Sequence, residues 1–288
     1  MKTLDNAVVV VTGGAAGIGR ALAIEAAARG AAVLIGDVQD AQPTVDAITI
    51  SGGRAEWRRC DMTQYSDVAN LAAYVVKRFG GVNVLCNNAG RGVPGALHAT
   101  DPAMARQVLD LNVLGLFHGI HAFTSQLQAA ASAGRPAFIL NTGSEHSLGV
   151  PPHVGPMSVY TASKFAALGL TETAARDLAP LGIKVSLLTP GWVRTERVAA
   201  LIGSSVEAAA RIEPYAQDSA EVAAKAFDGL AAGHLIIATN PASREFAMAH
   251  ARQLMAEVQR LPLLAGHPEH ENTATETKGR CPFMHGNP

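Results

Sequence analysis

The sequence predicts an α/β fold in which a doubly wound parallel sheet of about seven strands is covered by helices on both faces. Short apolar runs bounded by Gly, Asn or Asp recur along the chain, and helical patterns lie between them. Continuous rather than alternating hydrophobicity is typical of parallel strands that are buried on both faces. The predicted strands are residues 7–12, 31–37, 82–88, 137–143, 183–190 and 234–239, with a more polar strand near an edge at 54–60.

The chain contains neither a linker nor an internal repeat before residue 261, so residues 1–260 are expected to form a single domain that carries the chemistry. From residue 261 to residue 288 the composition changes to Pro, Gly, His, Thr and Glu. Such a tail is expected to be flexible or to pack on another subunit. Imidazole and thiolate groups also suit zinc or copper. The irregular spacing in the tail nevertheless favours no metal site at His267, His270, Cys281 and His285.

Composition and charge exclude several classes of function. The formal net charge is −1 and the isoelectric point is about 6.8, so the chain lacks the basic field that nucleic-acid binding requires. No apolar run approaches the roughly 20 residues of a membrane span. The N-terminus has no signal-peptide pattern, and the three cysteines lack zinc-type spacing. We therefore expect a soluble cytoplasmic protein that acts on a small molecule and has neither nucleic-acid nor membrane partners.

A glycine-rich segment, TGGAAGIG, lies where the first predicted strand ends and a helix begins. Glycine at positions 13, 17 and 19 would permit a tight turn and a close approach of backbone N–H groups to a pyrophosphate at the helix N-terminus. The spacing departs from the G-x-G-x-x-G fingerprint. A purely structural strand-to-helix turn therefore remains the alternative.

Asp37 closes the second predicted strand, where a carboxylate can accept hydrogen bonds from both hydroxyls of an adenosine ribose. The same carboxylate would repel a 2′-phosphate, and Ala15 and Ala16 supply no positive charge to offset it. The sequence therefore favours NAD over NADP. Asp61 and Met62 follow the third strand and are expected near the adenine, although Asp61 could equally be the N-cap of the next helix.

Six motifs occur in a fixed order: TGGAAGIG at 12–19, NNAG at 87–90, Asn112, a serine after the fifth strand, YTASK at 160–164 and PGWVRT at 190–195. Together they resemble the classical short-chain dehydrogenase/reductase family, over roughly residues 5–240. The resemblance implies a Rossmann-like fold and interconversion of a secondary alcohol and its ketone. It also implies a homodimer or homotetramer paired through helices near 105–130 and 160–180.

Tyr160 and Lys164 are four residues apart and therefore share one face of a helix. A phenol with a pKa of about 10 is a poor base at neutral pH. A neighbouring ammonium and a cationic nicotinamide would both favour the phenolate. Tyr160 is therefore the expected general acid or base. A chance pair of surface residues on a helix is the alternative.

The resemblance implies further roles. Lys164 would bind the nicotinamide ribose, and Asn112 would hold a water that connects Lys164 to solvent. Alternatively, Asn112 simply bonds a backbone carbonyl. The cofactor-binding residues implied are Gly13, Ala16, Gly17, Ile18, Gly19, Asp37, Asp61, Met62, Asn88, Ala89, Gly90, Tyr160, Lys164, Pro190, Gly191, Val193 and Thr195.

Substrate recognition is expected in a lid around residues 196–217, where the family varies. This segment is rich in Ala, Val, Ile and Leu with few charges, which favours a moderately bulky apolar alcohol or ketone, alicyclic or aromatic. Trp192 is expected to contact the substrate. The lid could equally bury its apolar residues against its own core.

Two serines compete for the catalytic position. The family's serine lies three residues after the strand's Asn, which selects Ser144, yet it usually lies about thirteen residues before the tyrosine, which selects Ser147. Ser144 is the preferred prediction because sheet hydrogen bonds fix the strand end, whereas the intervening loop can absorb extra residues. Glu145 and His146 either brace this loop or reach a second polar group on the substrate.

The sequence thus predicts an NAD-dependent alcohol dehydrogenase with Asn112, Ser144, Tyr160 and Lys164 as catalytic residues. The alternatives are an NADPH-dependent ketoreductase and a non-catalytic binding module that responds to NAD.

Overall fold

The computed structural model describes residues 4–261 and contains one seven-stranded sheet in which every pair of neighbouring strands is parallel. The strand order is β3-β2-β1-β4-β5-β6-β7. The predicted fold class and all seven predicted strands are confirmed. The strands are β1 (Val8–Thr12), β2 (Ala32–Asp37), β3 (Arg54–Arg59), β4 (Val84–Asn87), β5 (Phe138–Thr142), β6 (Lys184–Thr189) and β7 (Ile236–Ala238).

Strand β1 explains why the sequence shows continuous apolar runs. Val9 and Val11 pack into one hydrophobic cluster, whereas Val8 and Val10 pack into a second cluster on the opposite face of the sheet. Successive side chains of a strand point to opposite faces. A strand that is covered on both faces therefore needs apolar residues at every position. Strand β3 is more polar because it lies at the edge of the sheet.

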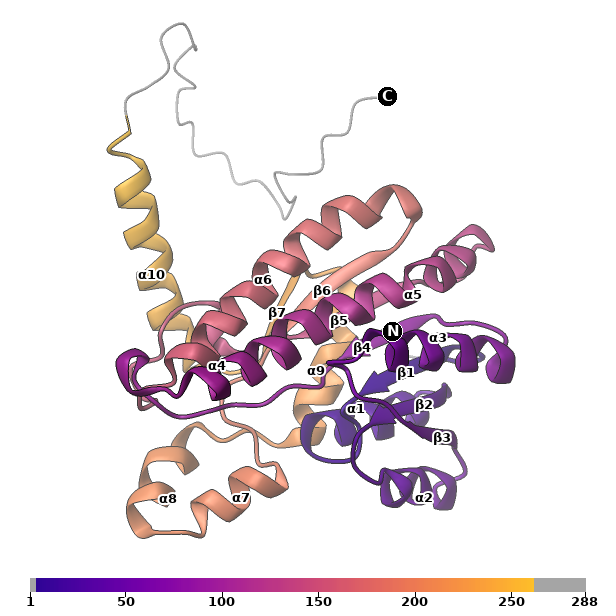
Figure 1. Ribbon diagram of the computed structural model, residues 1–288, viewed down its shortest axis with the longest axis horizontal. Coiled ribbons are helices and arrows are strands. Elements are labelled where there is room, and N and C mark those ends of the chain that lie inside the picture. Colours follow the sequence, from indigo (N-terminus) through magenta and orange to yellow (C-terminus); the bar gives the residue numbers. More distant parts are fainter. Residues whose placement is uncertain (1–3, 262–288) are drawn as a thin grey trace, which may run out of the picture.

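Helices cover both faces of the sheet, as Figure 1 shows. The first hydrophobic cluster joins the sheet to α1 (Gly17–Ala28), α2 (Gln42–Ile50) and α9 (Ser219–Ala232). The second joins it to α3 (Tyr65–Phe79), α5 (Gly115–Ser132) and α6 (Ser158–Leu178). Three further helices matter for the site: α4 (Pro102–Leu109), α7 (Glu196–Ile202) and α8 (Val206–Ile212).

The strand order reverses beside β1. From β1 the chain adds β2 and β3 on one side of the sheet, and then β4 to β7 on the other side. In open α/β sheets, ligands bind outside the carboxyl ends of the strands at such a switch point. The segments that follow β1, β2 and β4 therefore mark the expected site.

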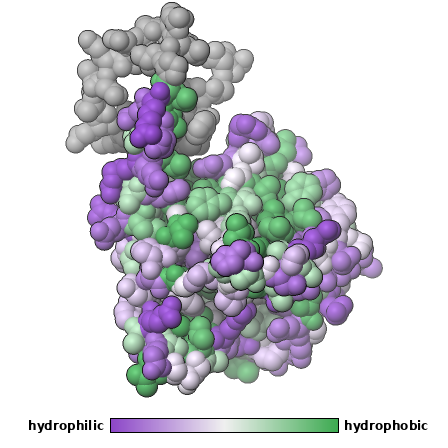
Figure 2. Space-filling view, turned by 60° about the vertical axis from the view of Figure 1, so that its left-hand side comes forward, coloured by the Kyte–Doolittle hydropathy of each residue, from purple (hydrophilic) through white to green (hydrophobic). Residues whose placement is uncertain are grey.

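Helix α10 (Ser243–Val258) rises away from the body of the molecule in Figure 1. The space-filling view shows hydrophobic and hydrophilic residues mixed over the face turned to the reader (Figure 2). No helix within residues 4–261 is long and apolar enough to cross a membrane. The predicted tail, with its four candidate metal ligands, lies outside the described residues apart from Leu261.

Candidate active site

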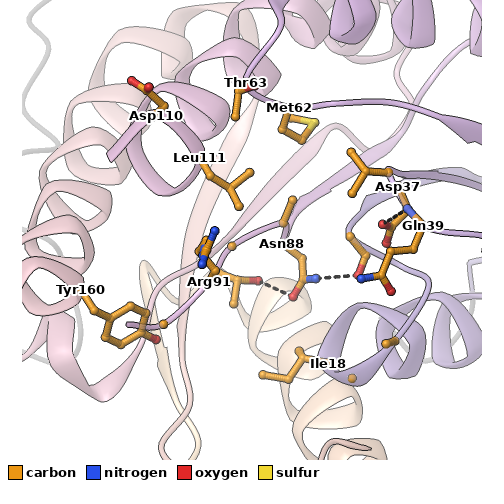
Figure 3. Close-up of a pocket in the computed structure, with 18 of the residues that line it drawn as sticks. Ile18, Asp37, Gln39, Met62, Thr63, Asn88, Arg91, Asp110, Leu111 and Tyr160 are labelled. Atoms are coloured by element: carbon orange, nitrogen blue, oxygen red, sulfur yellow. Dashed lines mark hydrogen bonds between the residues drawn. The ribbon is translucent and has the colours of Figure 1, made fainter. Parts of the chain in front are cut away.

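A cavity of about 1240 Å³ lies at the carboxyl ends of the strands, at the predicted switch point. Figure 3 shows Asp37 near one end and Tyr160 near the other, with Asn88 and Arg91 between them. A cavity of this size and shape can hold an extended ligand of the size of a dinucleotide. The predicted adenosine-binding and catalytic residues thus face the same space.

The glycine-rich loop forms one wall of this cavity. Gly13 has a φ of +69° and Gly17 a φ of +58°, which are left-handed conformations that favour glycine. A Cβ atom on Gly13 would lie 2.9 Å from the Cα atom of Ala89, and one on Gly19 would collide with the carbonyl of Gly13. Side chains at these positions would collide with neighbouring backbone and open the tight turn, so glycine is needed to keep the loop compact at the N-terminus of α1, where a pyrophosphate could approach.

Asp37 is held against this loop by two backbone groups. Its Oδ2 atom accepts a hydrogen bond of 2.9 Å from the N–H of Ala15, and its Oδ1 atom accepts one of 2.9 Å from the N–H of Gln39. Both bonds fix the carboxylate at the end of β2, where it lines the cavity. The orientation suits acceptance of hydrogen bonds from the hydroxyls of a ribose.

Asp61 also lines the cavity, and its Oδ1 atom accepts hydrogen bonds from the N–H and the hydroxyl of Thr63. The N-cap of α3 is Gln64. The alternative prediction, in which Asp61 caps this helix, is therefore wrong. The carboxylate stabilises the turn before the helix instead.

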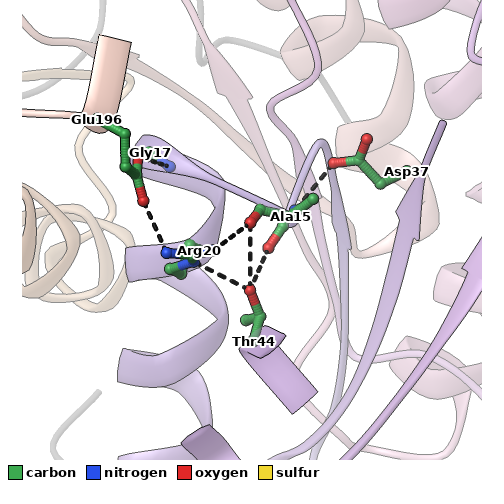
Figure 4. A network of polar contacts seen from close by, with 7 residues as sticks. Ala15, Gly17, Arg20, Asp37, Thr44 and Glu196 are labelled. Atoms are coloured by element: carbon green, nitrogen blue, oxygen red, sulfur yellow. Dashed lines mark hydrogen bonds and ion pairs between the residues drawn. The ribbon is translucent and has the colours of Figure 1, made fainter. Parts of the chain in front are cut away.

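A network of polar contacts joins the glycine-rich loop to the predicted lid, and Figure 4 shows it. The Oε2 atom of Glu196 accepts a hydrogen bond of 2.9 Å from the N–H of Gly17, and its Oε1 atom pairs with Arg20 at 2.7 Å. Arg20 also donates to the carbonyl of Ala15 and to the hydroxyl of Thr44. A carboxylate from the start of α7 therefore lies at the positive end of the α1 dipole.

Tyr160 and Lys164 lie on one face of α6, as their spacing predicts. The Nζ atom of Lys164 donates a hydrogen bond of 2.8 Å to the carbonyl of Thr142 and lies 5.5 Å from the centre of the Tyr160 ring. Burial lowers the pKa of Lys164 to about 8. The ammonium is therefore held between the end of β5 and the phenol.

The pKa of Tyr160 is raised above its usual value, chiefly by burial, and the negative charge of Glu145 acts in the same direction. A side-chain hydrogen bond with Ser144 opposes this shift. The sequence analysis expected Lys164 and a cationic nicotinamide together to lower the pKa of Tyr160. The side chains of the protein without the nicotinamide do not lower it. Burial disfavours the charged form more strongly than the hydrogen bond favours it.

The structure separates the two candidate serines. Ser144 and Tyr160 both line the large cavity, and the Oγ atom of Ser144 donates a hydrogen bond of 3.5 Å to the carbonyl of Pro190. The Oγ atom of Ser147 donates to the carbonyl of Lys164 at 2.8 Å and accepts from the N–H of Ser144 at 3.2 Å. Both hydrogen bonds of the Ser147 hydroxyl therefore hold the short helix η3 (Glu145–Ser147) against α6.

Asn112 is buried in the π-helical turn η2 (Asp110–Leu114) between α4 and α5. Its side chain bonds the N–H and the carbonyl of Arg91 and the hydroxyl of Ser163. This is the backbone-bonding alternative of the sequence analysis. It fixes the segment that follows Asn88, Ala89 and Gly90 along the floor of the cavity.

Glu145 and His146 are buried but line neither of the two cavities described here. Glu145 accepts from the hydroxyl of Ser243 at 2.8 Å and pairs with Nε2 of His153 at 3.0 Å. The Nδ1 atom of His146 bonds the hydroxyl of Thr161 at 2.8 Å. These contacts correspond to loop bracing rather than to the predicted substrate contact.

A second cavity, of about 470 Å³, lies beside the catalytic end. Trp192 lines it, in agreement with its predicted place, and its buried indole N–H has no acceptor among the described residues. The other wall residues come from two loops and the lid: Pro94, Gly95, Ala96, His153, Val154, Gly155, Pro156, Met157, Leu201, Ala208, Arg211 and Ile212.

The large cavity contains nearly all the predicted cofactor-binding residues. The exceptions are Gly19, which lies behind the loop, and Val193, which is buried in the first hydrophobic cluster. The residues found at the wall are Gly13, Ala16, Gly17, Ile18, Asp37, Asp61, Met62, Asn88, Ala89, Gly90, Tyr160, Lys164, Pro190, Gly191 and Thr195.

Sequence reasoning missed Glu196, Arg91 and Arg197, which also line the large cavity. Arg91 directly follows NNAG, and Glu196 and Arg197 directly follow PGWVRT. Adjacency to a cofactor-binding motif was therefore the one available signal. It could not show which of these side chains turns inward.

Comparison with known proteins agrees with this geometry. A family model for short chain dehydrogenases matches residues 7–203. The chain is 36% identical over 219 residues to 2,5-dichloro-2,5-cyclohexadiene-1,4-diol dehydrogenase of Sphingobium indicum, which covers 75% of this chain and 82% of that protein. It is 40% identical over 197 residues to cis-4-hydroxycyclohexanecarboxylate dehydrogenase of Sinomonas cyclohexanicum, with 67% and 76% covered.

A solved structure shows the same likeness. A short-chain dehydrogenase/reductase from Burkholderia phymatum in complex with NAD superimposes with a TM-score of 0.76 at 29% identity. The match covers 92% of this chain and 99% of that one. The fold and the site define a nicotinamide-dependent oxidoreductase of the alcohol dehydrogenase type. The chain belongs to the short-chain dehydrogenase/reductase family.

Proposed function

We propose that this protein is an NAD-dependent dehydrogenase that interconverts an alicyclic secondary alcohol and its ketone, with Tyr160 as general acid and base. The observation that carries the proposal is the Tyr160–Ser144 pair, which faces the dinucleotide-sized cavity while an apolar cavity lies beside it. The phenol is half-buried at the cavity wall and lies near an ammonium, which suits a proton-transferring group.

In the oxidative direction, Tyr160 accepts the hydroxyl proton of the alcohol while Ser144 holds the same oxygen by a hydrogen bond. When bound, the oxidised nicotinamide supplies the hydride acceptor and a positive charge that favours the phenolate. In the reductive direction, Tyr160 returns the proton to the carbonyl oxygen. The chain therefore contributes orientation, a hydrogen bond and a proton-transfer group.

Lys164 supports this proton transfer from the other side of the phenol. Its ammonium stabilises the phenolate by charge, and a pKa of about 8 allows it to lose or regain a proton near neutral pH. Asn112 is proposed to act through the backbone of Arg91 and through Ser163, which lies beside Lys164 on α6. A water held by Asn112 would extend the relay to solvent.

NAD is proposed as the cofactor because Asp37 lies where a 2′-phosphate would otherwise sit. The alicyclic substrate is proposed from the apolar second cavity and from the two curated relatives, whose names describe dehydrogenases of substituted six-membered rings. A pocket of about 470 Å³ is ample for one such ring.

The test is turnover of the purified enzyme with a panel of secondary alcohols, monitored through the absorbance of reduced nicotinamide. The panel pairs cyclohexanol and substituted cyclohexanols with linear alcohols of equal carbon number, each with NAD and with NADP. We expect the highest kcat/KM for a cyclohexanol with NAD. A preference for linear alcohols contradicts the substrate class, a preference for NADP contradicts the cofactor, and no turnover at all favours a binding module.

A further inference from the structure

The second cavity adjoins the catalytic centre. The Cε atom of Met157, a wall residue of the second cavity, lies 3.0 Å from the place that a Cβ atom of Gly92 would take. Gly92 in turn lines the large cavity, and the ring of Tyr160 lies 3.9 Å from the same point. Trp192 and Gly191 are consecutive residues on the two walls. The two cavities are therefore neighbours at Gly92, Met157 and the Gly191–Trp192 segment.

The wall of the second cavity is mostly apolar and contains one charged side chain among its described residues. Among its described residues, Arg211 is the one Arg, Lys, Asp or Glu side chain, and it belongs to the last turn of the lid helix α8. Its Nη2 atom lies 3.5 Å from the place that a Cβ atom of Gly155 would take. The exposed guanidinium thus reaches from the lid to the loop that contains Gly155.

Arg211 makes no ion pair and no side-chain hydrogen bond with the described residues. Glu207, four residues earlier on α8, could pair with it by spacing. No ion pair joins the two side chains among the described residues. The cation is therefore left without an ion-pair partner among residues 4–261.

The other arginines near the catalytic end are already engaged. Arg197 donates to the carbonyl of Gly92, and Arg91 donates to the side chains of Gln107 and Met104. The carboxylate behind the cavity wall, Glu145, is satisfied by His153 and Ser243 and lines neither cavity. No acidic side chain of the described wall would repel an anion in the second cavity.

We propose that the substrate is an alicyclic hydroxy acid and that Arg211 binds its carboxylate, while the ring packs against the apolar wall and the hydroxyl meets Tyr160 and Ser144. A planar guanidinium suits bidentate binding of a carboxylate. An apolar pocket with one cation on its wall can hold the ring and the carboxylate of such a molecule together. This inference rests on the proposed function and deepens it.

The test compares three substrates: 4-hydroxycyclohexanecarboxylate as each stereoisomer, its methyl ester, and cyclohexanol. Each is assayed with wild type, Arg211→Gln, Arg211→Lys and Arg194→Gln. Arg194 is the matched control, because it precedes the same lid, is exposed and lines neither cavity. In parallel, calorimetry measures binding of cyclohexanecarboxylate, which cannot react, and of cyclohexanecarboxamide to the complex of each variant with NADH.

We expect wild type to prefer one isomer of the acid over its ester by at least about tenfold in kcat/KM, since a charged hydrogen-bonded pair is lost in the ester. Arg211→Gln should remove this preference by lowering kcat/KM for the acid alone. Arg211→Lys should restore part of it, and Arg194→Gln should retain it. Cyclohexanecarboxylate should likewise bind Arg211→Gln about tenfold more weakly, with the amide unaffected.

Equal turnover of acid and ester by wild type, or an equal loss on both in Arg211→Gln, would overturn the inference and leave the proposed function intact. Arg197→Gln is assayed in the same way, and a loss confined to the acid in that variant, with Arg211→Gln unchanged, would overturn the assignment of the carboxylate to Arg211. If none of the alcohols is oxidised, the proposed function fails, and calorimetry alone decides whether Arg211 binds a carboxylate.

Discussion

The hydroxyl of Ser147 donates a hydrogen bond of 2.8 Å to the backbone carbonyl of Lys164. Ser147 is the serine that the spacing from Tyr160 would select. Its hydrogen bond instead holds the short helix η3 against α6. Ser144, two residues after the end of β5, lines the same cavity as Tyr160. The loop between η3 and α6 can absorb extra residues without moving the end of β5, so the spacing to Tyr160 is the weaker guide.

Ser144→Ala should lower kcat by about a hundredfold, which is typical of losing one preorganised donor to the reacting oxygen. Ser147→Ala should affect turnover less and lower the free energy of unfolding by about 1 kcal/mol, because it removes a buried hydrogen bond. Steady-state kinetics and urea denaturation of both variants separate the two effects. A larger loss of kcat in Ser147→Ala than in Ser144→Ala would reverse the assignment.

Asp37→Ser combined with Val38→Arg should shift the cofactor preference from NAD toward NADP. The change removes a carboxylate that repels a 2′-phosphate and adds a guanidinium beside it. The measurement is the ratio of kcat/KM for the two cofactors. The control is Asp40→Ser, on the same loop but outside the cavity wall, which should keep the wild-type ratio. An unchanged ratio in the double variant would show that Asp37 does not face the ribose.

Glu196→Gln should strengthen NADH binding by about two- to fivefold, since removal of a charge at a helix N-terminus is worth about 0.3–1 kcal/mol. The carboxylate accepts from the N–H of Gly17, which is one of the groups that would bind a pyrophosphate. Fluorescence titration gives the dissociation constants. Glu207→Gln, on the same lid, should bind NADH as wild type does. Weaker binding in Glu196→Gln would mean that the carboxylate supports the cofactor site.

Because His146 is buried, we expect the free energy of unfolding to fall in mild acid. Burial lowers its pKa from 6.5 to about 4, with smaller contributions from the charges of His153 and Lys164. Between these two values the unfolded chain binds more protons than the folded protein, so stability falls as the pH falls. From pH 7 to pH 5 this group should remove about 2 kcal/mol from the free energy of unfolding.

The His146→Gln variant should therefore show a flatter dependence of stability on pH than wild type. Urea denaturation at several pH values measures the slopes. His98→Gln, at an exposed position, is the control and should keep the wild-type slope. Parallel curves for wild type and His146→Gln would show that the imidazole titrates in the folded protein as it does in the unfolded chain.

The strands and the Tyr160–Lys164 pair could be predicted because their signals are local. A run such as that of β1 is apolar at every position, and two residues four apart share a helix face whatever the rest of the chain does. Ser144 could be chosen over Ser147 because the end of a strand is fixed by the sheet, whereas loop length is not.

Other features of the site depend on contacts between distant segments. Glu196, which follows β6, meets Gly17, which follows β1, and Glu145 meets Ser243 at the start of α10. Adjacency to Ser144 suggested that Glu145 and His146 face the substrate. The short helix η3 instead turns both side chains toward α6 and α10, because successive side chains on such a turn point in different directions.

The central claim is that Tyr160 transfers the proton, and turnover of Tyr160→Phe tests it most directly. We predict a fall in kcat of at least about a hundredfold, which is the lower range for loss of a general acid or base. NADH binding, measured by fluorescence, should stay close to that of wild type, because the variant keeps the ring and the α6 helix. Turnover within a few fold of wild type, with NADH binding retained, would contradict the account.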